Sequence, residues 1–94
     1  MINKYVLTNK KWVAITTAGQ NAAVWVNKNI KGSGRVYLNH SDSGNPNSYG
    51  IRLFSQTGNS NIREFVADNQ NDILYARLLD NNNEVEIYVD VEEV

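Results

Sequence analysis

Histidine, serine and aspartate stand next to one another at positions 40, 41 and 42, and these are the residue types of a hydrolytic triad. A triad works only when its members converge from different elements, with the imidazole between the hydroxyl and the carboxylate. Neighbours on an extended chain point apart instead. We therefore expect this segment to begin a loop in which Ser41 or Asp42 caps a turn, and the protein not to be an enzyme.

Oxygen ligands of the kind that bind calcium gather at residues 68–72 (DNQND), and Asp42, Asp80 and Asp90 could approach them in the fold. The segment does not match an EF-hand loop, and Asx-rich turns commonly hydrogen-bond their own backbone. His40 is the only histidine, cysteine is absent, and none of the zinc-binding spacings occurs. We expect no metal and no cofactor, with calcium at this turn as the alternative.

Paired carboxylates for glycoside hydrolysis would have to lie about 5 to 10 Å apart in a cleft. The acids fall instead in the 68–72 turn and along the last apolar run, residues 84–92 (EVEIYVDVE). Polar and apolar residues alternate in this run with the period of a strand that has one face in the core. We expect Val85, Ile87 and Val89 to face the core, and Glu86 to belong to a solvated acidic face that discourages edge pairing.

Aromatic residues allow one binding function. Sandwich domains often carry a flat aromatic platform on which sugars stack. We expect most aromatic side chains to be core and the two tryptophans to be buried or half-buried, so a carbohydrate-binding module is kept as the alternative function. The residues that could contribute to a platform are Trp12, Trp25, Tyr37, Tyr49, Phe54, Tyr75 and Tyr88.

Short runs rich in β-branched and aromatic residues must position these side chains, and turn-forming residues separate them about every ten positions. None of the runs sustains a helical period, and residues 73–79 are too few for a stable helix. The longest irregular stretch, residues 40–48, is predicted to be a surface loop. The expected strands are residues 4–8, 11–16, 23–27, 35–39, 49–54, 62–66, 73–79 and 84–92.

Seven or eight short strands without helices indicate an all-β protein, an antiparallel β-sandwich. A jelly roll and an immunoglobulin-like Greek key both fit this pattern, although the Cys…Trp…Cys signature of antibody domains cannot occur without cysteine. The 94 residues fit one sandwich domain over positions 1–94.

Charge and hydropathy exclude several partners. The net charge is −1, with no basic block that would bind nucleic acid. There is neither a leader-like N-terminus nor an apolar stretch near the ~20 residues of a membrane span. Fifteen asparagines are unusual, but a hydrophobic content of 41% suffices for a packed interior. We expect a complete, soluble, folded polypeptide that binds no nucleic acid and no membrane.

Several segments together resemble a known group of proteins. They are residues 8–12 (TNKKW), 18–21 (AGQN) before 24–26 (VWV), 35–38 (RVYL) running into 40–46 (HSDSGNP), 71–76 (NDILYA), and the Val-rich last run. In this order they are similar to the small β-sandwich virion proteins of tailed bacteriophages. Such proteins occur as capsid decoration (auxiliary) proteins and as head-fibre or tail-fibre attachment modules, and they have no enzymatic site to carry over.

This resemblance implies a non-enzymatic structural protein of a bacteriophage virion that is assembled in the host cytoplasm. Its partners would be other virion proteins, either the major capsid protein or a fibre protein, with self-association as a further option. Contact through the first strand or through the long loop is expected, because the acidic last strand disfavours edge pairing. The loop consists of His40, Ser41, Asp42, Ser43, Gly44, Asn45, Pro46, Asn47 and Ser48.

Overall fold

The computed structural model describes residues 1–32, 34–53, 55–56, 59–60 and 62–92. All regular elements within these ranges are strands, and the two four-stranded sheets that they form are antiparallel. The strands are β1 (Ile2–Leu7), β2 (Val13–Ala14), β3 (Ala22–Lys31), β4 (Val36–Ser41), β5 (Ile51–Leu53), β6 (Ser55–Gln56), β7 (Asn59–Ser60), β8 (Arg63–Phe65), β9 (Ile73–Leu78) and β10 (Glu84–Val91).

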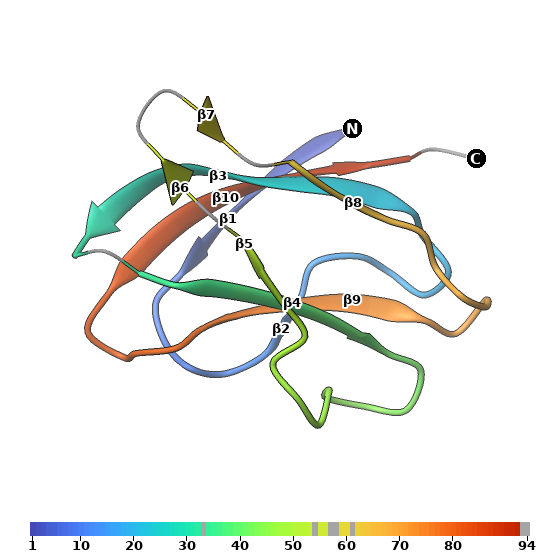
Figure 1. Cartoon of the computed structure of the whole chain (residues 1–94). Helices are drawn as coiled ribbons and strands as arrows, with labels where there is room; N and C mark the ends of the chain where they lie inside the picture. The colour runs from blue at the N-terminus through green and yellow to red at the C-terminus, as the bar shows by residue number, and fades with distance from the viewer. Residues whose placement is uncertain (33, 54, 57–58, 61, 93–94) are drawn as a thin grey trace.

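The two sheets lie face to face as the layers of a sandwich (Figure 1). One sheet has the strand order β1-β10-β3-β8, the other has the order β2-β9-β4-β5, and β6 and β7 form a separate two-stranded ladder. The predicted all-β antiparallel sandwich is therefore confirmed. No helix long and apolar enough to cross a membrane occurs within the described ranges.

The strand pairs are nested in the sequence. The pair β4–β5 is innermost, and β3–β8, β2–β9 and β1–β10 enclose it in turn. Each strand of an outer pair therefore meets a partner far away along the chain, and the first and last strands, β1 and β10, lie side by side (Figure 1). The last strand, β10, lies between β1 and β3. We expected the acidic side chains of the last strand to discourage pairing at a sheet edge. This expectation is wrong, because β10 is an inner strand and β1 forms the edge.

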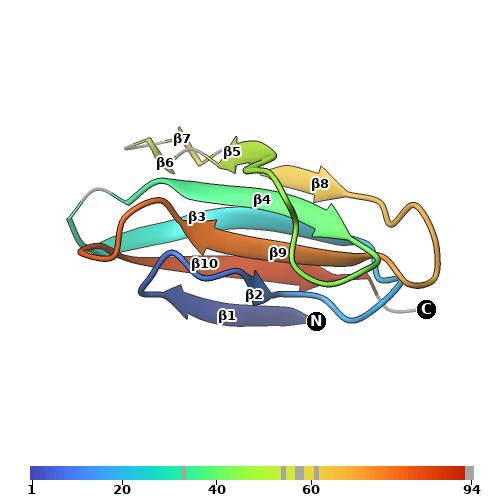
Figure 2. The same ribbon diagram turned by 90° about the horizontal axis from the view of Figure 1, so that it is seen from below.

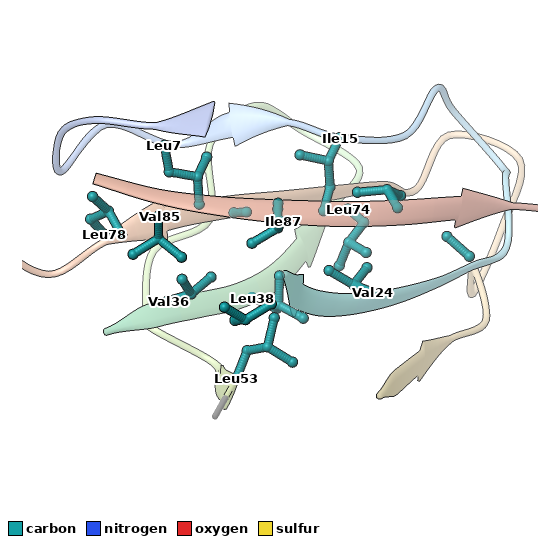
Figure 3. Close-up of a cluster of buried hydrophobic side chains, with 14 of the residues drawn as sticks. Leu7, Ile15, Val24, Val36, Leu38, Leu53, Leu74, Leu78, Val85 and Ile87 are labelled. Carbon is teal, nitrogen blue, oxygen red and sulfur yellow. The ribbon is translucent and has the colours of Figure 1, made fainter. Parts of the chain in front are cut away.

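The space between the sheets is filled by aliphatic side chains, drawn in Figure 3. Val85, Ile87 and Val89 are fully buried, as their alternation in the sequence predicts. The cluster consists of Leu7, Ile15, Ala22, Val24, Val26, Val36, Leu38, Leu53, Leu74, Ala76, Leu78, Val85, Ile87, Val89 and Val91.

Most of the described aromatic rings lie outside this core, which corrects the expectation that most would be core. Trp25 and Tyr88 oppose each other on neighbouring strands, with ring centroids 5.7 Å apart on the outer face of their sheet. Of the candidate platform residues, Tyr75 is the only one shown to be buried, and Phe54 lies outside the described residues. On β3 and β10 the inward positions hold Val, Ile and Ala, and the aromatic residues Trp25 and Tyr88 occupy outward positions. Tyr5 and Phe65 are partly buried and pack against the aliphatic cluster.

Several boundaries differ from the sequence-based expectations. The expected strand at 11–16 is reduced to Val13–Ala14, whereas the strand expected at 23–27 extends to Ala22–Lys31. The strand expected at 35–39 continues through His40 and Ser41, so these residues end β4 and do not begin the loop. The ladder with β9 explains this extension, because His40 pairs with Leu74 and Ser41 with Ile73.

Glu86 was expected in water, yet only 6% of its surface is exposed. It does lie on the outer face of β10, but Asn27 donates a hydrogen bond to its carboxylate and the Lys4 ammonium lies 3.6 Å from it. The Asn27 hydrogen bond, together with the nearby Lys28 and Lys4 charges, lowers the pKa of Glu86 below its ordinary value. The residue is thus a cross-strand link between β1, β10 and β3.

Candidate functional site

His40 and Asp72 meet at the end of the sandwich where β4 finishes and β9 begins. The Nδ1 atom of His40 lies 2.9 Å from each carboxylate oxygen of Asp72, and Asp72 is 2% exposed. The backbone N–H of Asp68 donates a further hydrogen bond of 2.9 Å to Asp72 Oδ2. The Asp68 carboxylate is itself exposed, 3.8 Å from the His40 Nδ1. The pair ties the end of β4 to the 68–72 turn.

His40, Asp68 and Asp72 each offer one ligand atom, and these atoms lie within 4.8 Å of one another. The fold thus brings the histidine to the oxygen-rich turn, a juxtaposition that the sequence analysis did not anticipate. The hydrogen bonds from His40 and the Asp68 amide already satisfy both Asp72 oxygens, as a buried carboxylate requires. These hydrogen bonds account for the arrangement of His40 and Asp72 as a structural contact between β4 and the 68–72 turn.

The aspartates expected to approach this turn do so unequally. Asp42 accepts a hydrogen bond of 3.2 Å from the Asn69 amide and is thus joined to the turn. Asp90 lies on β10, where its carboxylate is 3.5 Å from the N-terminal amine. Asp80 follows the far end of β9, and six strand residues at about 3.3 Å each place it about 20 Å from Asp72.

The His40-Ser41-Asp42 segment does not form a triad. Ser41 Oγ accepts a hydrogen bond of 3.2 Å from the backbone N–H of Ser43, so Ser41 caps a turn as expected. The His40 ring bonds Asp72, and its other neighbour is the Phe65 ring at 5.5 Å between centroids. Among the residues the structure describes, no hydroxyl hydrogen-bonds this imidazole.

The remainder of the predicted contact loop is exposed in its middle and fixed at both ends. Ser43, Gly44 and Asn45 are exposed, and Gly44 has a φ of 95°, which favours glycine. Pro46 is buried. Beyond it, the Asn39 amide donates hydrogen bonds of 3.1 Å to both the carbonyl and the hydroxyl oxygen of Ser48. The loop is therefore a firmly attached protrusion whose tip faces solvent.

A second polar site lies on the outer face of the sheet β2-β9-β4-β5. We call it the Arg77 stack, and it consists of Trp12, Arg77, Tyr49 and Tyr37. The guanidinium carbon of Arg77 lies over the Trp12 ring at 5.5 Å from its centroid and over the Tyr49 ring at 5.0 Å. The Tyr49 and Tyr37 rings are 5.0 Å apart. These distances are those of cation–π and tilted aromatic contacts.

A cleft of about 320 Å³ opens at the Arg77 stack. It is lined by Trp12, Pro46, Asn47, Ser48, Tyr49 and Arg77. The loop after β4 thus contributes its second half to one wall, and the segment before β2 contributes the other. Two stretches that are far apart in the sequence meet because β2 and β4 are both paired with β9.

Sequence reasoning singled out the aromatic residues of this cleft but missed Arg77. The residue stands in a run whose alternation is weak, with Ile73, Tyr75 and Arg77 as the outward side chains of β9. Its position opposite Tyr37 follows only from the register of β4 and β9. That register links positions 40 apart, and no local pattern in the chain reports it.

A larger apolar groove of about 740 Å³ lies between the β5 and β8 edges, where the two sheets part. Leu38, Leu74 and Phe65 form its inner surface, and Ile51 and Ile62 stand at its rim with 55% and 59% of their surface exposed. His40 also lines it, so the His40–Asp72 pair is at one end of this groove. At the opposite edge of the sandwich, Ile2 and Val6 of β1 are also exposed.

No family model matches the chain, and neither a curated protein nor a solved structure matches it.

Proposed function

We propose that the protein is a non-enzymatic structural component of a bacteriophage virion, a capsid decoration (auxiliary) or fibre-attachment protein that binds the particle surface. Its sandwich would be a jelly roll. The nested strand pairs support this topology, as does the alternation of successive strands between the two four-stranded sheets, which only the β4–β5 hairpin and the separate β6–β7 ladder interrupt. An immunoglobulin-like key would keep its first two strands in one sheet, whereas β1 and β2 belong to different sheets. Jelly rolls serve both as viral capsid domains and as lectins.

The observation that carries the proposal is the set of exposed apolar side chains on the edge strand β1, which also carries Lys4 beside the Glu86 carboxylate. Figure 2 shows β1 and β2 at the same edge, and β1 is the terminal strand of its sheet. Ile2 and Val6 are 56% and 47% exposed on β1, and Val13 on β2 is 38% exposed. A terminal strand presents backbone donors and acceptors to another chain, and exposed apolar side chains strengthen such pairing.

The loop tip at residues 43–45 is the second contact route. It protrudes from the end of β4, and its attachment through Asn39 and Ser41 keeps it ordered before binding. Ordered surfaces lose little conformational freedom on association. A shell presents many equivalent sites, so modest affinity at each copy is enough when one protomer touches two neighbours.

Purified virions of the phage that encodes the chain test the proposal. Mass spectrometry should find the protein in stoichiometric amounts, and recombinant protein should co-sediment with particles that lack it. Val6→Lys should weaken this co-sedimentation, because a lysine on an edge strand opposes pairing. The matched control is Ile30→Lys, at a β3 position that is 45% exposed and outside the β1 edge. Absence from virions, or equal binding by the two variants, would contradict the proposal.

A carbohydrate-binding module is the second candidate, and the outward aromatic residues favour it. Trp25 with Tyr88 and the Arg77 stack place aromatic rings on the outer faces of both sheets. Sugars stack on such rings through their C–H faces, and jelly rolls are also a lectin architecture. Glycan binding that is abolished by Trp12→Ala or Trp25→Ala, with no association with virions, would establish this candidate in place of the first.

A further inference from the structure

We propose that the cleft at the Arg77 stack is a binding site for a sugar ring that carries a carboxylate, the chemical class of the hexuronic acids. This inference rests on the second candidate function, and it is independent of whether the domain attaches to a particle. Three features of the cleft support it: a cation with unused donors, aromatic walls, and a fixed shape.

Arg77 supplies the charge. Its Nε–H donates to the Leu78 carbonyl oxygen at 3.1 Å, which fixes the plane of the guanidinium and leaves its other N–H donors available. No carboxylate forms an ion pair with Arg77 within the described part of the chain. A planar guanidinium matches a carboxylate in a bidentate arrangement, and such charge-assisted hydrogen bonds are the strong ones. The half-buried guanidinium of Arg77 is therefore suited to bind the carboxylate of a ligand.

The walls select a sugar over a simple anion. Trp12 and Tyr49 present aromatic rings, and Pro46 adds an apolar surface for the C–H groups of a pyranose. The Asn47 amide and the Ser48 hydroxyl provide polar groups for ring hydroxyls. A volume of about 320 Å³ lies at the small end of the range for ligand pockets. It suits one sugar ring and not an extended acidic peptide.

Both sides of the cleft are held before any ligand binds. The Asn39 amide fixes Ser48 through two hydrogen bonds of 3.1 Å. On the other side, the Lys11 N–H donates to Asn9 Oδ1 at 2.9 Å and shapes the turn that leads into Trp12. A site that is formed in advance requires little ordering on binding, which favours recognition of a small ligand.

Titration with glucuronate, glucose and acetate, followed by NMR, tests the inference on the wild-type chain. Glucuronate should shift the Trp12 indole N–H and the Arg77 Nε–H resonances, and it should bind at least about tenfold more tightly than glucose or acetate, because charge-assisted hydrogen bonds and ring stacking act together. Arg77→Lys keeps the charge but loses the planar fork, and it should weaken glucuronate binding about tenfold. Arg35→Lys, at an exposed arginine that does not line the cleft, is the control and should bind as the wild type does.

The remaining outcomes separate this inference from the function it rests on. Equal affinity for glucose and glucuronate would overturn the acidic specificity and keep the carbohydrate-binding module. If acetate bound as tightly as glucuronate, the sugar ring would not contribute to binding, and the inference that the site binds a sugar would be overturned. Shifts confined to Trp25 would overturn this site and keep the carbohydrate-binding module, and no shifts with any of the three ligands would overturn this site. The wild-type titration decides among these outcomes even if Arg77→Lys lowers stability.

Discussion

Charged side chains lie at both ends of the ladder that joins β4 and β9, and the surroundings of these charges differ between the two ends. At one end, the buried Asp72 carboxylate receives hydrogen bonds from His40 and from the Asp68 amide. At the other end, Arg77 lies opposite Tyr37 among aromatic rings and has no carboxylate partner among the described residues. A buried charge whose partners belong to its own chain stabilises the fold, whereas a held cation without an anion is suited to a ligand.

Both ends depend on one aliphatic core, whose disruption should give the largest effect. Ile87→Ala removes a fully buried side chain from β10 and should lower the free energy of unfolding by about 2 to 5 kcal/mol through the cavity it leaves. Ile30→Ala, at a position 45% exposed on the neighbouring strand β3, should cost less than about 0.5 kcal/mol. Urea denaturation measures both variants. Equal costs would mean that Ile87 does not face the core.

The core was predictable from the sequence and the ladder ends were not. The alternation of Val85, Ile87 and Val89 with acidic residues fixes which face of β10 is buried, because strand side chains point to opposite sides in turn. Glu86 shows the limit of this rule: it points outward as expected, yet Lys4 and Asn27 from neighbouring strands cover it. Outward does not mean exposed when the cross-strand neighbours are long.

The candidate site was predictable only in its parts. The sequence analysis identified His40 and the 68–72 turn separately, and it listed Trp12 and Tyr49 as possible platform residues. Their assembly depends on β9 pairing with both β2 and β4, which joins segments that are more than 30 positions apart. Pairings of this range follow from the closure of the whole sandwich, and local periodicity contains no record of them.

Substitution of Asp72 should have the second largest effect on the free energy of unfolding. Asp72→Ala leaves the His40 ring and the Asp68 amide without their acceptor, so the free energy of unfolding should fall by about 1 to 3 kcal/mol. Asp42→Ala is the matched control, because Asp42 is exposed and accepts a longer bond of 3.2 Å from Asn69, and it should cost less than about 0.5 kcal/mol. If the two variants lose the same free energy of unfolding, the buried His40–Asp72 pair does not stabilise this end of the sandwich.

The Arg77 end should contribute less to stability than the Asp72 end does. Arg77→Ala loses two cation–π contacts, each worth about 0.5 to 1 kcal/mol at partly exposed sites, so a total cost of about 1 to 2 kcal/mol is expected. Urea denaturation of Arg77→Ala beside Asp72→Ala tests the comparison directly. A loss at Arg77 that exceeds the loss at Asp72 would show that the stack is a structural element and would remove the contrast between the two ends.

Glu86 is a paired charge on the other sheet, and we expect its contribution to stability to depend on pH. Its pKa is lowered in the folded protein, chiefly by the Asn27 hydrogen bond, so the stability it contributes is present above the pKa of the unfolded chain, about 4.3 for glutamate. This contribution disappears as the pH falls through the lower, folded value. The urea midpoint of the wild type should exceed that of Glu86→Gln at pH 7, and the gap should close toward pH 3. Glu64→Gln, at an exposed position on β8, should show no such closing gap.

Chelation should have no effect, and it tests the assignment of the Asp72 end most directly. The ligand atoms of His40, Asp68 and Asp72 lie close enough to share a cation, but the Asp72 oxygens are already satisfied by two donors. Treatment with EDTA should therefore leave the melting temperature unchanged. A fall of more than about 4 °C, the shift that about 1 kcal/mol causes in a domain of this size, would mean that a bound cation stabilises the fold. If Asp68→Asn then abolished the sensitivity to EDTA, the cation would lie at this end of β4 and β9, and the two ends of the ladder would both be ligand sites.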